Sequence, residues 1–349
     1  MIKNKFHKLF HWEHWPLLMF YIPNIPYAFL HGIKIRNFVF YTVVNPGIKD
    51  SGIGSESKYE TLNLLPKKYL PKSVFHDQDQ DIELTIQRIK EEGIPYPMIV
   101  KPDQGFRGLL VKKVQDENQL KAYLEKYPVA IVIQEFLAHE HECGIFYYRH
   151  PNEELGKVTS ITLKEFLTVK GDGVSTLKEL VINDERAFLY FNLLKDNSLL
   201  KWETVLKKGE YKKLSDIGNH SKGTKFINGN HLINKKLEAS FDTLNHQAKG
   251  WYYGRLDIKY NTLEDLNNGN FKVLELNGIL AEPTHIYDAS KMTYLKALKT
   301  IRVHWKQLYR IAYYNNKHQG VAFRKTIPFV KDMIVLKRYT NRLKRLSKK

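Results

Sequence analysis

The sequence contains a single cysteine, Cys143, among 349 residues. One cysteine excludes a disulfide within the chain and a metal–thiolate cluster, and it fits a reducing, cytoplasmic compartment. Acidic residues are also scarce, with 37 Asp and Glu against 55 Lys and Arg, which gives a net charge of +18. A chain this basic is expected to meet an anionic partner, such as a membrane, a nucleic acid or an acidic protein.

The aromatic-rich start of the chain lacks the apolar length of a membrane span. Its uncharged run, residues 15–30, has 16 residues, fewer than the roughly 20 that a spanning helix needs. Pro16, Pro23 and Pro26 interrupt the run, and the absence of a small-residue cleavage site argues against a signal peptide. Two interpretations stay open: the segment packs as core against the body of the protein, which we favour, or it lies in a membrane interface.

The last 19 residues, "KDMIVLKRYTNRLKRLSKK", are strongly basic. They hold eight Lys or Arg and one Asp, a net charge of +7. Residues 331–349 are therefore either a solvated basic helix or a contact for an anionic membrane surface, which would make the protein peripheral at the inner face of the membrane. No nucleic-acid-binding motif is found, so nucleic acid is not the expected partner.

The order of the elements favours an α+β fold class. Hydrophobic residues make up 43% of the chain, which is typical of a globular protein. Two short apolar runs around a polar turn at 103–108 predict a hairpin, and "WYYGRLDIKY" and "NFKVLELNG" predict two more strands. Residues 45–58 read as a Gly/Ser-rich covering loop or a linker, and residues 289–316 as the last long helix. Hairpins mixed with helices favour α+β layers over an alternating parallel sheet.

The two late strands predict a metal site. Residues two apart on a strand share a face, so Asp257 shares a face with Arg255, and Glu275 with Asn277. If the strands pair, Asp257, Glu275 and Asn277 converge as oxygen ligands for Mg²⁺. Arg255 is then available for a phosphoryl group. The alternative is a buried salt bridge, which would leave one carboxylate without a balancing charge.

Two further segments carry chemistry only in combination. Lys101 ends the apolar strand "YPMIV", and Gly105 and Gly108 follow it in a turn where backbone N–H groups can approach phosphates. Farther along, the apolar run "IVIQEFLAHEHE" ends in polar residues. Taken alone, the first is a hairpin loop with an incidental lysine and the second an ordinary strand exit.

Five segments in this order resemble ATP-grasp enzymes: "YPMIVKP", "QGFRG", "IVIQEFLAHEHE", "GRLDIKY" and "FKVLELNG". The set is similar to D-alanine–D-alanine ligases and other carboxylate–amine ligases. The section "VKGDGVSTLKELV", with "VLKKGE" and the "GNHSKGT" loop, is more similar to the ATP-grasp portion of cyanophycin synthetases. The resemblance implies an ATP-grasp fold, two α+β subdomains that grip ATP, after a short aromatic-rich N-terminal region.

The resemblance also implies roles for individual residues. Lys101 would contact the nucleotide phosphates beneath the loop 104–108, with Lys164, chosen over Lys170, as the second lysine. Arg255 would stabilise the transition state. Mg²⁺, or Mn²⁺ in its place, would bind Asp257, Glu275 and Asn277, which we call the late-strand trio. The nucleotide base and ribose would be held by four residues near the strand exit: Glu135, Phe136 and Leu137 as the adenine hinge, and Glu142 for the ribose hydroxyls.

The chain departs from these ligases at both ends of the resemblance. The region before the lysine strand is short and aromatic-rich, and "ILAEPTHIYD" at 279–288 replaces the usual substrate signature. D-Alanine is therefore not supported as the substrate. The candidate substrate contacts lie in this segment and in the "GNHSKGT" loop: Glu282, His285, Tyr287, Asn219 and Ser221. His285 is equally well explained as the cap of a loop.

These observations predict four regions: an aromatic-rich N-terminal region at 1–75, ATP-grasp subdomains at 76–149 and 150–290, and a C-terminal helix with a basic tail at 291–349. The resemblance implies an ATP- and Mg²⁺-dependent ligase that joins a small-molecule carboxylate to an amine through an acyl phosphate. One alternative is an ATP-dependent phosphotransferase or a sugar- or cell-envelope-associated ATP-grasp enzyme. The other is a basic protein that binds membranes or nucleic acid.

Overall fold

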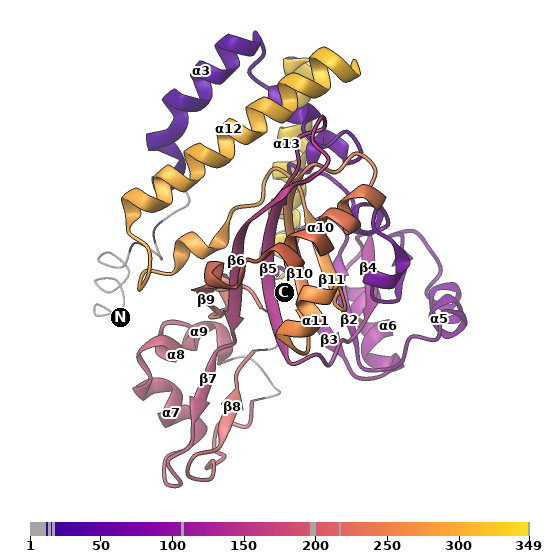
Figure 1. Cartoon of the computed structure of the whole chain (residues 1–349). Helices are drawn as coiled ribbons and strands as arrows, with labels where there is room; N and C mark the ends of the chain where they lie inside the picture. Colours follow the sequence, from indigo (N-terminus) through magenta and orange to yellow (C-terminus); the bar gives the residue numbers. More distant parts are fainter. Residues whose placement is uncertain are drawn as a thin grey trace.

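The protein forms two main antiparallel sheets with helices packed against them (Figure 1), which confirms the α+β class. The structure is a computed structural model that describes residues 12, 15, 18–105, 108–195, 200–215 and 218–347. The strands are β1 (Ser73–His76), β2 (Met98–Pro102), β3 (Lys112–Val114), β4 (Ile131–Glu135), β5 (His141–Tyr148), β6 (Lys157–Glu165), β7 (Thr168–Lys170), β8 (Tyr211–Lys213), β9 (Lys225–Asn228), β10 (Tyr253–Tyr260) and β11 (Lys272–Asn277).

The helices flank these sheets and include two long ones near the C-terminus (Figure 1). They are α2 (Leu18–Tyr21), α3 (Ile25–Ile35), α4 (Lys58–Leu62), α5 (Ile82–Glu91), α6 (Glu117–Lys126), α7 (Leu177–Asn183), α8 (Glu185–Leu189), α9 (Phe191–Leu194), α10 (Lys235–Gln247), α11 (Leu263–Asn268), α12 (Tyr294–Gln319) and α13 (Thr326–Leu346). Three short 3₁₀ turns also matter below: η2 (Ile22–Asn24), η6 (His220–Lys222) and η8 (Thr284–Tyr287).

The first sheet has the strand order β1-β4-β2-β3 and includes the predicted hairpin of β2 and β3. Apolar side chains of α5 and α6 pack on it, among them Ile86, Ile89 and Leu120. Leu343 of α13 joins the same core and is fully buried. The first sheet is therefore covered partly by a helix from the far end of the chain.

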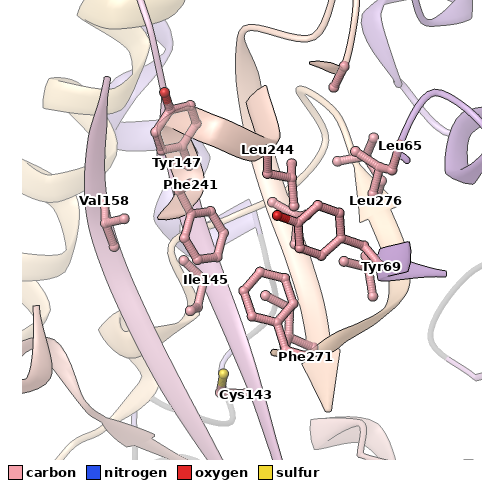
Figure 2. Close-up of a cluster of buried hydrophobic side chains, with 14 of the residues drawn as sticks. Leu65, Tyr69, Cys143, Ile145, Tyr147, Val158, Phe241, Leu244, Phe271 and Leu276 are labelled. Carbon is pink, nitrogen blue, oxygen red and sulfur yellow. The ribbon is translucent and has the colours of Figure 1, made fainter. Parts of the chain in front are cut away.

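The second sheet has the order β11-β10-β5-β6-β9, and β10 and β11 form the predicted antiparallel pair. Alternation along β5 and β10 sends Cys143, Ile145, Tyr147, Leu256 and Ile258 to one face, where Phe241 of α10 and Phe271 pack on them (Figure 2). Phe146 and Tyr253 point to the other face and meet Phe40 and Ile311 of α12. Arg255 and Asp257 lie on this second face, because they continue the alternation of Tyr253.

The loop at 45–58, predicted as a covering loop or a linker, is neither. The Asn45 side chain is fully buried and donates to the carbonyl of Tyr253 at 2.8 Å. Ser51 is also buried, and its carbonyl accepts the N–H of Ile279 at 3.0 Å. A Cβ on Gly52 would lie 2.7 Å from the Cα of Gly278, so the two backbones touch where β11 ends. Tertiary contacts therefore bury this glycine-rich segment against β10 and the end of β11.

Two of the predicted region boundaries fall inside the sheets. The boundary at 75/76 cuts β1, which pairs with β4 in the first sheet. Strand β5 was assigned to the first subdomain, 76–149, but it lies in the second sheet between β10 and β6. The change of sheet occurs between β4 and β5, within residues 136–140.

The basic C-terminal segment is a second long helix, so the prediction that residues 289–316 form the last long helix was wrong. Helix α13 is docked on the first sheet through Leu343, and Arg342 Nη2 donates to the carbonyl of Pro128 at 2.8 Å. Lys348 and Lys349 of the predicted tail lie outside the described residues. The charge of the segment alone gave no sign of this docked face.

The aromatic N-terminal region packs partly as core. Phe20 of α2 is fully buried and meets the ring of Tyr294 at a centroid distance of 5.6 Å. His31 of α3 stacks on Tyr309 of α12, with centroids 4.5 Å apart. In the part of the chain that the structure describes, no helix is long and apolar enough to cross a membrane.

Candidate active site

The predicted late-strand residues do converge, because β10 and β11 pair in the register that brings them together. Asp257 lies opposite Glu275, and Arg255 lies opposite Asn277. The Asp257 carboxylate accepts from Arg255 Nη2 at 3.2 Å and from the Asn277 amide at 3.1 Å. The side-chain period of two, together with the assumed pairing of the two strands, predicted that these residues come together.

Lys164 of β6 reaches the same carboxylate across β5, on the same face of the sheet. Its Nζ lies 2.9 Å from Asp257 Oδ1 and 2.7 Å from Glu142 Oε1, and all three side chains are buried. Burial alone would lower the pKa of Lys164, but the charges of Asp257 and Glu142 outweigh it and raise that pKa. Lys170, the alternative lysine, is exposed on β7 and lies 5.5 Å from the Tyr211 ring centroid.

Asp257 is the anionic centre of the cluster. Its burial would raise the pKa, but Arg255 and Lys164 hold the pKa well below the usual range of an aspartate. Both of its oxygens have cationic partners. Arg255 also donates to the Glu282 carbonyl at 3.3 Å, and its buried Nε has no hydrogen-bond partner among the described residues.

Lys101 connects the two sheets. It lies on β2 of the first sheet, and its Nζ donates to the Leu274 carbonyl of β11 at 3.0 Å and to Gln134 Oε1 at 3.2 Å. Both acceptors are neutral. Burial of the side chain lowers the pKa of Lys101 to about 8, and the more distant carboxylates only partly oppose that effect. The site thus lies where the two sheets meet.

Sequence reasoning missed Lys58 and Gln134. Lys58, the first residue of α4, forms an ion pair with Glu275 at 3.5 Å and donates to the Gly105 carbonyl at 2.8 Å. No signal in the sequence points to it. Gln134 had a signal, a polar residue on the buried side of the apolar strand β4, where it is 2% exposed.

The charges of the cluster correct one argument made from the sequence. A salt bridge to Arg255 was expected to leave a carboxylate unbalanced, and this imbalance favoured a metal ion. Lys164 and Lys58 supply the missing charge, so the cluster holds three carboxylates and four basic side chains: Glu142, Asp257 and Glu275 with Lys58, Lys101, Lys164 and Arg255. Among the described residues, no group of three or more His, Cys, Asp and Glu side chains is arranged to hold a metal ion.

The predicted adenine hinge lies at the end of β4. Glu135 Oε1 accepts the N–H of Lys72 at 2.9 Å, and Lys113 Nζ lies 3.7 Å from the centroid of the Phe136 ring. The carbonyl of Leu137 accepts from Lys259 at 3.1 Å. Lys259 pairs in register with Glu142 across β10 and β5, so the hinge is linked to the charged cluster.

The predicted phosphate loop, 104–108, is described only in part, because Phe106 and Arg107 lie outside the described residues. Gly105 accepts the bond from Lys58 already noted, and Gly108 has a φ of +68° that favours glycine. The flanking Gln104 side chain donates to the carbonyl of Ser55 at 2.9 Å. The described parts of this loop are therefore tied to the segment that precedes α4.

The candidate substrate residues fall into two groups. Glu282 accepts from Tyr287 at 2.7 Å and from Tyr21 of α2 at 2.6 Å. His285 is buried instead, with its Nδ1 2.7 Å from Ser160 Oγ, and burial lowers its pKa to about 4. A neutral, packed imidazole favours the structural interpretation of His285 and leaves the Glu282 carboxylate as the stronger candidate.

The "GNHSKGT" loop approaches both parts of the site. Asn219 caps η6 by accepting the N–H of Ser221 at 2.9 Å. His220 of η6 lies beside Tyr287, with ring centroids 6.1 Å apart. Gly218 lies against the Glu142 carboxylate, where a Cβ would come within 2.3 Å of Oε1. A side chain at this position would therefore force the loop or the carboxylate to move.

Comparison with known proteins identifies one family. The family model of the RimK-like ATP-grasp domain matches residues 55–151. The resemblance to ATP-grasp proteins is confirmed. The matched segment includes Lys101, the predicted phosphate loop at 104–108 and the predicted adenine hinge at 135–137. No curated protein matches the sequence.

Solved structures with similar folds include two ligases and a synthetase. The VanG D-Ala:D-Ser ligase from Enterococcus faecalis is 15% identical with a TM-score of 0.42, over 73% of this chain and 62% of that one. The D-alanine–D-alanine ligase from Bacillus anthracis complexed with ATP is 15% identical with a TM-score of 0.43, over 75% and 70%. A bifunctional glutathione synthetase from Pasteurella multocida is 16% identical with a TM-score of 0.37, over 72% and 36%. The chain thus spans less than two thirds of the VanG ligase.

Proposed function

We propose that the protein is an ATP- and Mg²⁺-dependent ligase that joins a small-molecule carboxylate to an amine through an acyl phosphate. The observation that carries the proposal is the basic cluster at the junction of the two sheets, within a chain that matches the ATP-grasp domain. Lys101, Lys164 and Arg255 converge there from three different strands. Such a cluster attracts a polyphosphate, since its basic side chains outnumber its carboxylates.

Charge repulsion is the main barrier to the first step. A carboxylate oxygen of the substrate attacks the γ-phosphorus of ATP, and the bond to the β,γ-bridging oxygen breaks to release ADP. Both reactants are anions, so Lys101 and Arg255 would screen their approach. Lys101 suits this role because its two acceptors, Gln134 Oε1 and the Leu274 carbonyl, are neutral. Its Nζ could therefore bind phosphate oxygens in their place without breaking an ion pair.

The second step forms the product bond. The amine nitrogen attacks the acyl carbon, the bond to the phosphate oxygen breaks, and the nitrogen loses a proton as inorganic phosphate leaves. Glu282 is the candidate to hold the amine, because Tyr287 and Tyr21 donate to its carboxylate and Arg255 donates to its backbone carbonyl. A carboxylate held by two hydroxyl groups favours a cationic ammonium over a second acid.

The late-strand trio fits Mg²⁺ in chemistry. Asp257, Glu275 and Asn277 offer oxygen donors on adjacent strands. Each carboxylate would exchange a lysine partner for the ion, Lys164 at Asp257 and Lys58 at Glu275, and the released ammonium groups would then be free for phosphate oxygens. When bound, Mg²⁺, or Mn²⁺ in its place, supplies charge neutralisation at the transferring phosphate.

The hinge at Glu135–Leu137 would bind the adenine base through backbone groups. Glu142 would accept hydrogen bonds from the ribose hydroxyls, as the ATP-grasp resemblance implies. In the structure Glu142 is bound to Lys164 at 2.7 Å, so nucleotide binding would move Lys164 away from both of its carboxylates at once. The ribose and the metal sites would therefore be coupled through this one lysine.

Trapping the intermediate tests the proposal. Purified protein is incubated with MgATP, hydroxylamine and a panel of carboxylic acids, and hydroxamate and ADP are measured together. We expect hydroxamate with at least one acid, and a loss of at least tenfold in Lys101→Met. Lys112→Met is the matched control, because Lys112 lies opposite Val100 on β3 and is exposed. A phosphorylated product with no hydroxamate for any acid would instead indicate a phosphotransferase.

A further inference from the structure

The N-terminal helices carry an apolar face that no described residue covers. A third of the exposed large apolar side chains of the described chain lie within residues 18–38, a stretch of 21 residues. They recur along α2, η2 and α3 and are Leu18, Met19, Ile22, Ile25, Phe29, Leu30, Ile33 and Phe38, exposed by 44% to 64%. We call this set the α3 face. Such a concentration of exposed apolar surface marks a contact with something other than water.

The spacing of these residues places them on the outer side of the helix. Ile22, Ile25, Phe29 and Ile33 follow one another at intervals of three and four residues. The opposite side is already used, since His31 stacks on Tyr309 of α12. Figure 1 shows α3 running beside α12 on the side away from the sheets. The helix thus carries apolar side chains on its outer side as well as contacts with α12 on its inner side.

Positive charge surrounds this face. Residues 14–49 contain no Asp or Glu, and neither do residues 289–331, which hold ten Lys and Arg. Lys34 of α3 and Lys306 of α12 are both exposed and both lie close enough to His31 to act on its charge. The layer that α3 and α12 form therefore presents exposed basic side chains next to its exposed apolar ones.

We propose that the α3 face docks on an anionic lipid bilayer, with its apolar side chains in the boundary between headgroups and acyl chains. Basic residues beside an exposed apolar helix face are the pattern of interfacial membrane helices. A second copy of the chain fits less well, because two such layers would bring like charges together. The proposal does not depend on the ligase activity.

The sequence offered two possible membrane contacts, the aromatic segment at 15–30 and the basic segment at 331–349, and the α3 face overlaps the first. In the basic segment, Leu343 of α13 packs in the core of the first sheet and Arg342 donates to the carbonyl of Pro128. The α3 face is also connected to the candidate active site, because Tyr21 of α2 donates to Glu282. Docking would therefore hold the candidate substrate residues next to the bilayer.

Vesicle sedimentation of the full-length protein tests the proposal. Vesicles of phosphatidylcholine with phosphatidylglycerol are compared with pure phosphatidylcholine at low and moderate salt. We expect binding to the anionic vesicles only, weakened by salt. Ile25→Ser/Ile33→Ser should weaken it at least about tenfold, because burial of two isoleucines is lost. Leu155→Ser/Val174→Ser is the matched control, since both residues are more exposed and lie elsewhere.

A charge series separates the electrostatic part. Lys34→Glu/Lys306→Glu should abolish binding at moderate salt, whereas Lys207→Glu/Lys208→Glu, an equal change of charge on an exposed turn, should retain it. The proposal is overturned if the wild-type protein does not bind anionic vesicles, or if Ile25→Ser/Ile33→Ser binds them as well as its control does. It is also overturned if Lys337→Glu/Arg338→Glu in α13 is by itself enough to remove binding. Concentration-dependent dimers lost in Ile25→Ser/Ile33→Ser, without vesicle binding, would assign the face to a second copy.

Discussion

Two buried lysines, one from each sheet, face the same cluster in opposite electrostatic settings. Lys101 of the first sheet donates to an amide oxygen and a backbone carbonyl, and burial lowers its pKa to about 8. Lys164 of the second sheet lies between two carboxylates, which raise its pKa despite equal burial. The difference shows that the charge of the partners, and not the depth of burial, decides whether the pKa of a buried lysine is raised or lowered.

The contrast has a functional meaning. Lys164 stabilises the fold as it stands, since it neutralises Asp257 and Glu142. Lys101 carries a buried charge whose hydrogen-bond acceptors are neutral, so we expect a phosphate bound there to stabilise it. Lys164 therefore lies in an ion-pair network, whereas Lys101 is bound to an amide oxygen and a backbone carbonyl.

Removal of the shared carboxylate should have the largest effect. Asp257→Asn leaves Arg255 and Lys164 with less negative charge in a buried site, so we expect a loss of about 3–5 kcal/mol in the free energy of unfolding at pH 7. Denaturant titration measures it, with the exposed Asp79→Asn as the control. The pKa of Asp257 is held low, so its contribution is full above pH about 4, the unfolded value, and fades as the pH falls further.

An unchanged midpoint for Asp257→Asn would show that the basic residues are satisfied without this carboxylate. The comparison of the two lysines would then lose its basis, because the setting of Lys164 depends on Asp257.

Lys164→Met should cause the next largest loss in the free energy of unfolding. It leaves Asp257 and Glu142 facing each other without the ammonium, and we expect a loss of about 2–3 kcal/mol, since Arg255 still balances one charge. Affinity for a non-hydrolysable ATP analogue, measured by calorimetry, should also fall at least about tenfold. Lys170→Met is the control. Equal effects of the two substitutions on nucleotide affinity would remove Lys164 from the phosphate site.

Lys101→Met should act in the opposite direction on stability. Replacement of a poorly balanced buried ammonium should raise the free energy of unfolding at pH 7 by about 1–3 kcal/mol, while nucleotide affinity falls. The folded pKa of about 8 lies below the unfolded value of about 10.5, so the wild-type protein becomes more stable as the pH rises between them. The advantage of Lys101→Met should therefore shrink over that range.

Thermal or denaturant unfolding at pH 7 and pH 10 measures this difference, with Lys112→Met unchanged. A destabilised Lys101→Met at pH 7 would mean that the hydrogen bonds to Gln134 and Leu274 outweigh the cost of burial, and that the two lysines are alike.

Tyr21→Phe should have the smallest effect. It removes one hydroxyl donor from Glu282 and is expected to cost about 1 kcal/mol, because Tyr287 still donates to that carboxylate. If Glu282 holds the amine as proposed, the KM for the amine substrate should rise more than kcat falls. Tyr313→Phe, on an exposed part of α12, is the control. A kcat effect without a KM effect would move Glu282 away from amine binding.

Part of the site could be predicted because it depends on local spacing. Asp257 lies opposite Glu275 as expected, since strand alternation and a short connection fix the register of a hairpin. The α+β class and the lysine strand were predictable for the same reason. Glycine content misled at residues 45–58, because the polar and flexible composition of a loop says nothing about the Asn45 and Ser51 bonds that bury it.

The sequence by itself determined which oxygen-bearing residues share a face and where the basic residues gather along the chain, because both depend on neighbours a few positions apart. Only the tertiary structure decided which cation meets which carboxylate. Lys164 and Asp257 are separated by 93 residues, and Lys101 and Leu274 by 173. The tertiary structure likewise placed Leu343 of α13 in the core of the first sheet. Such pairings follow from the packing of two sheets, and no local period in the sequence encodes them.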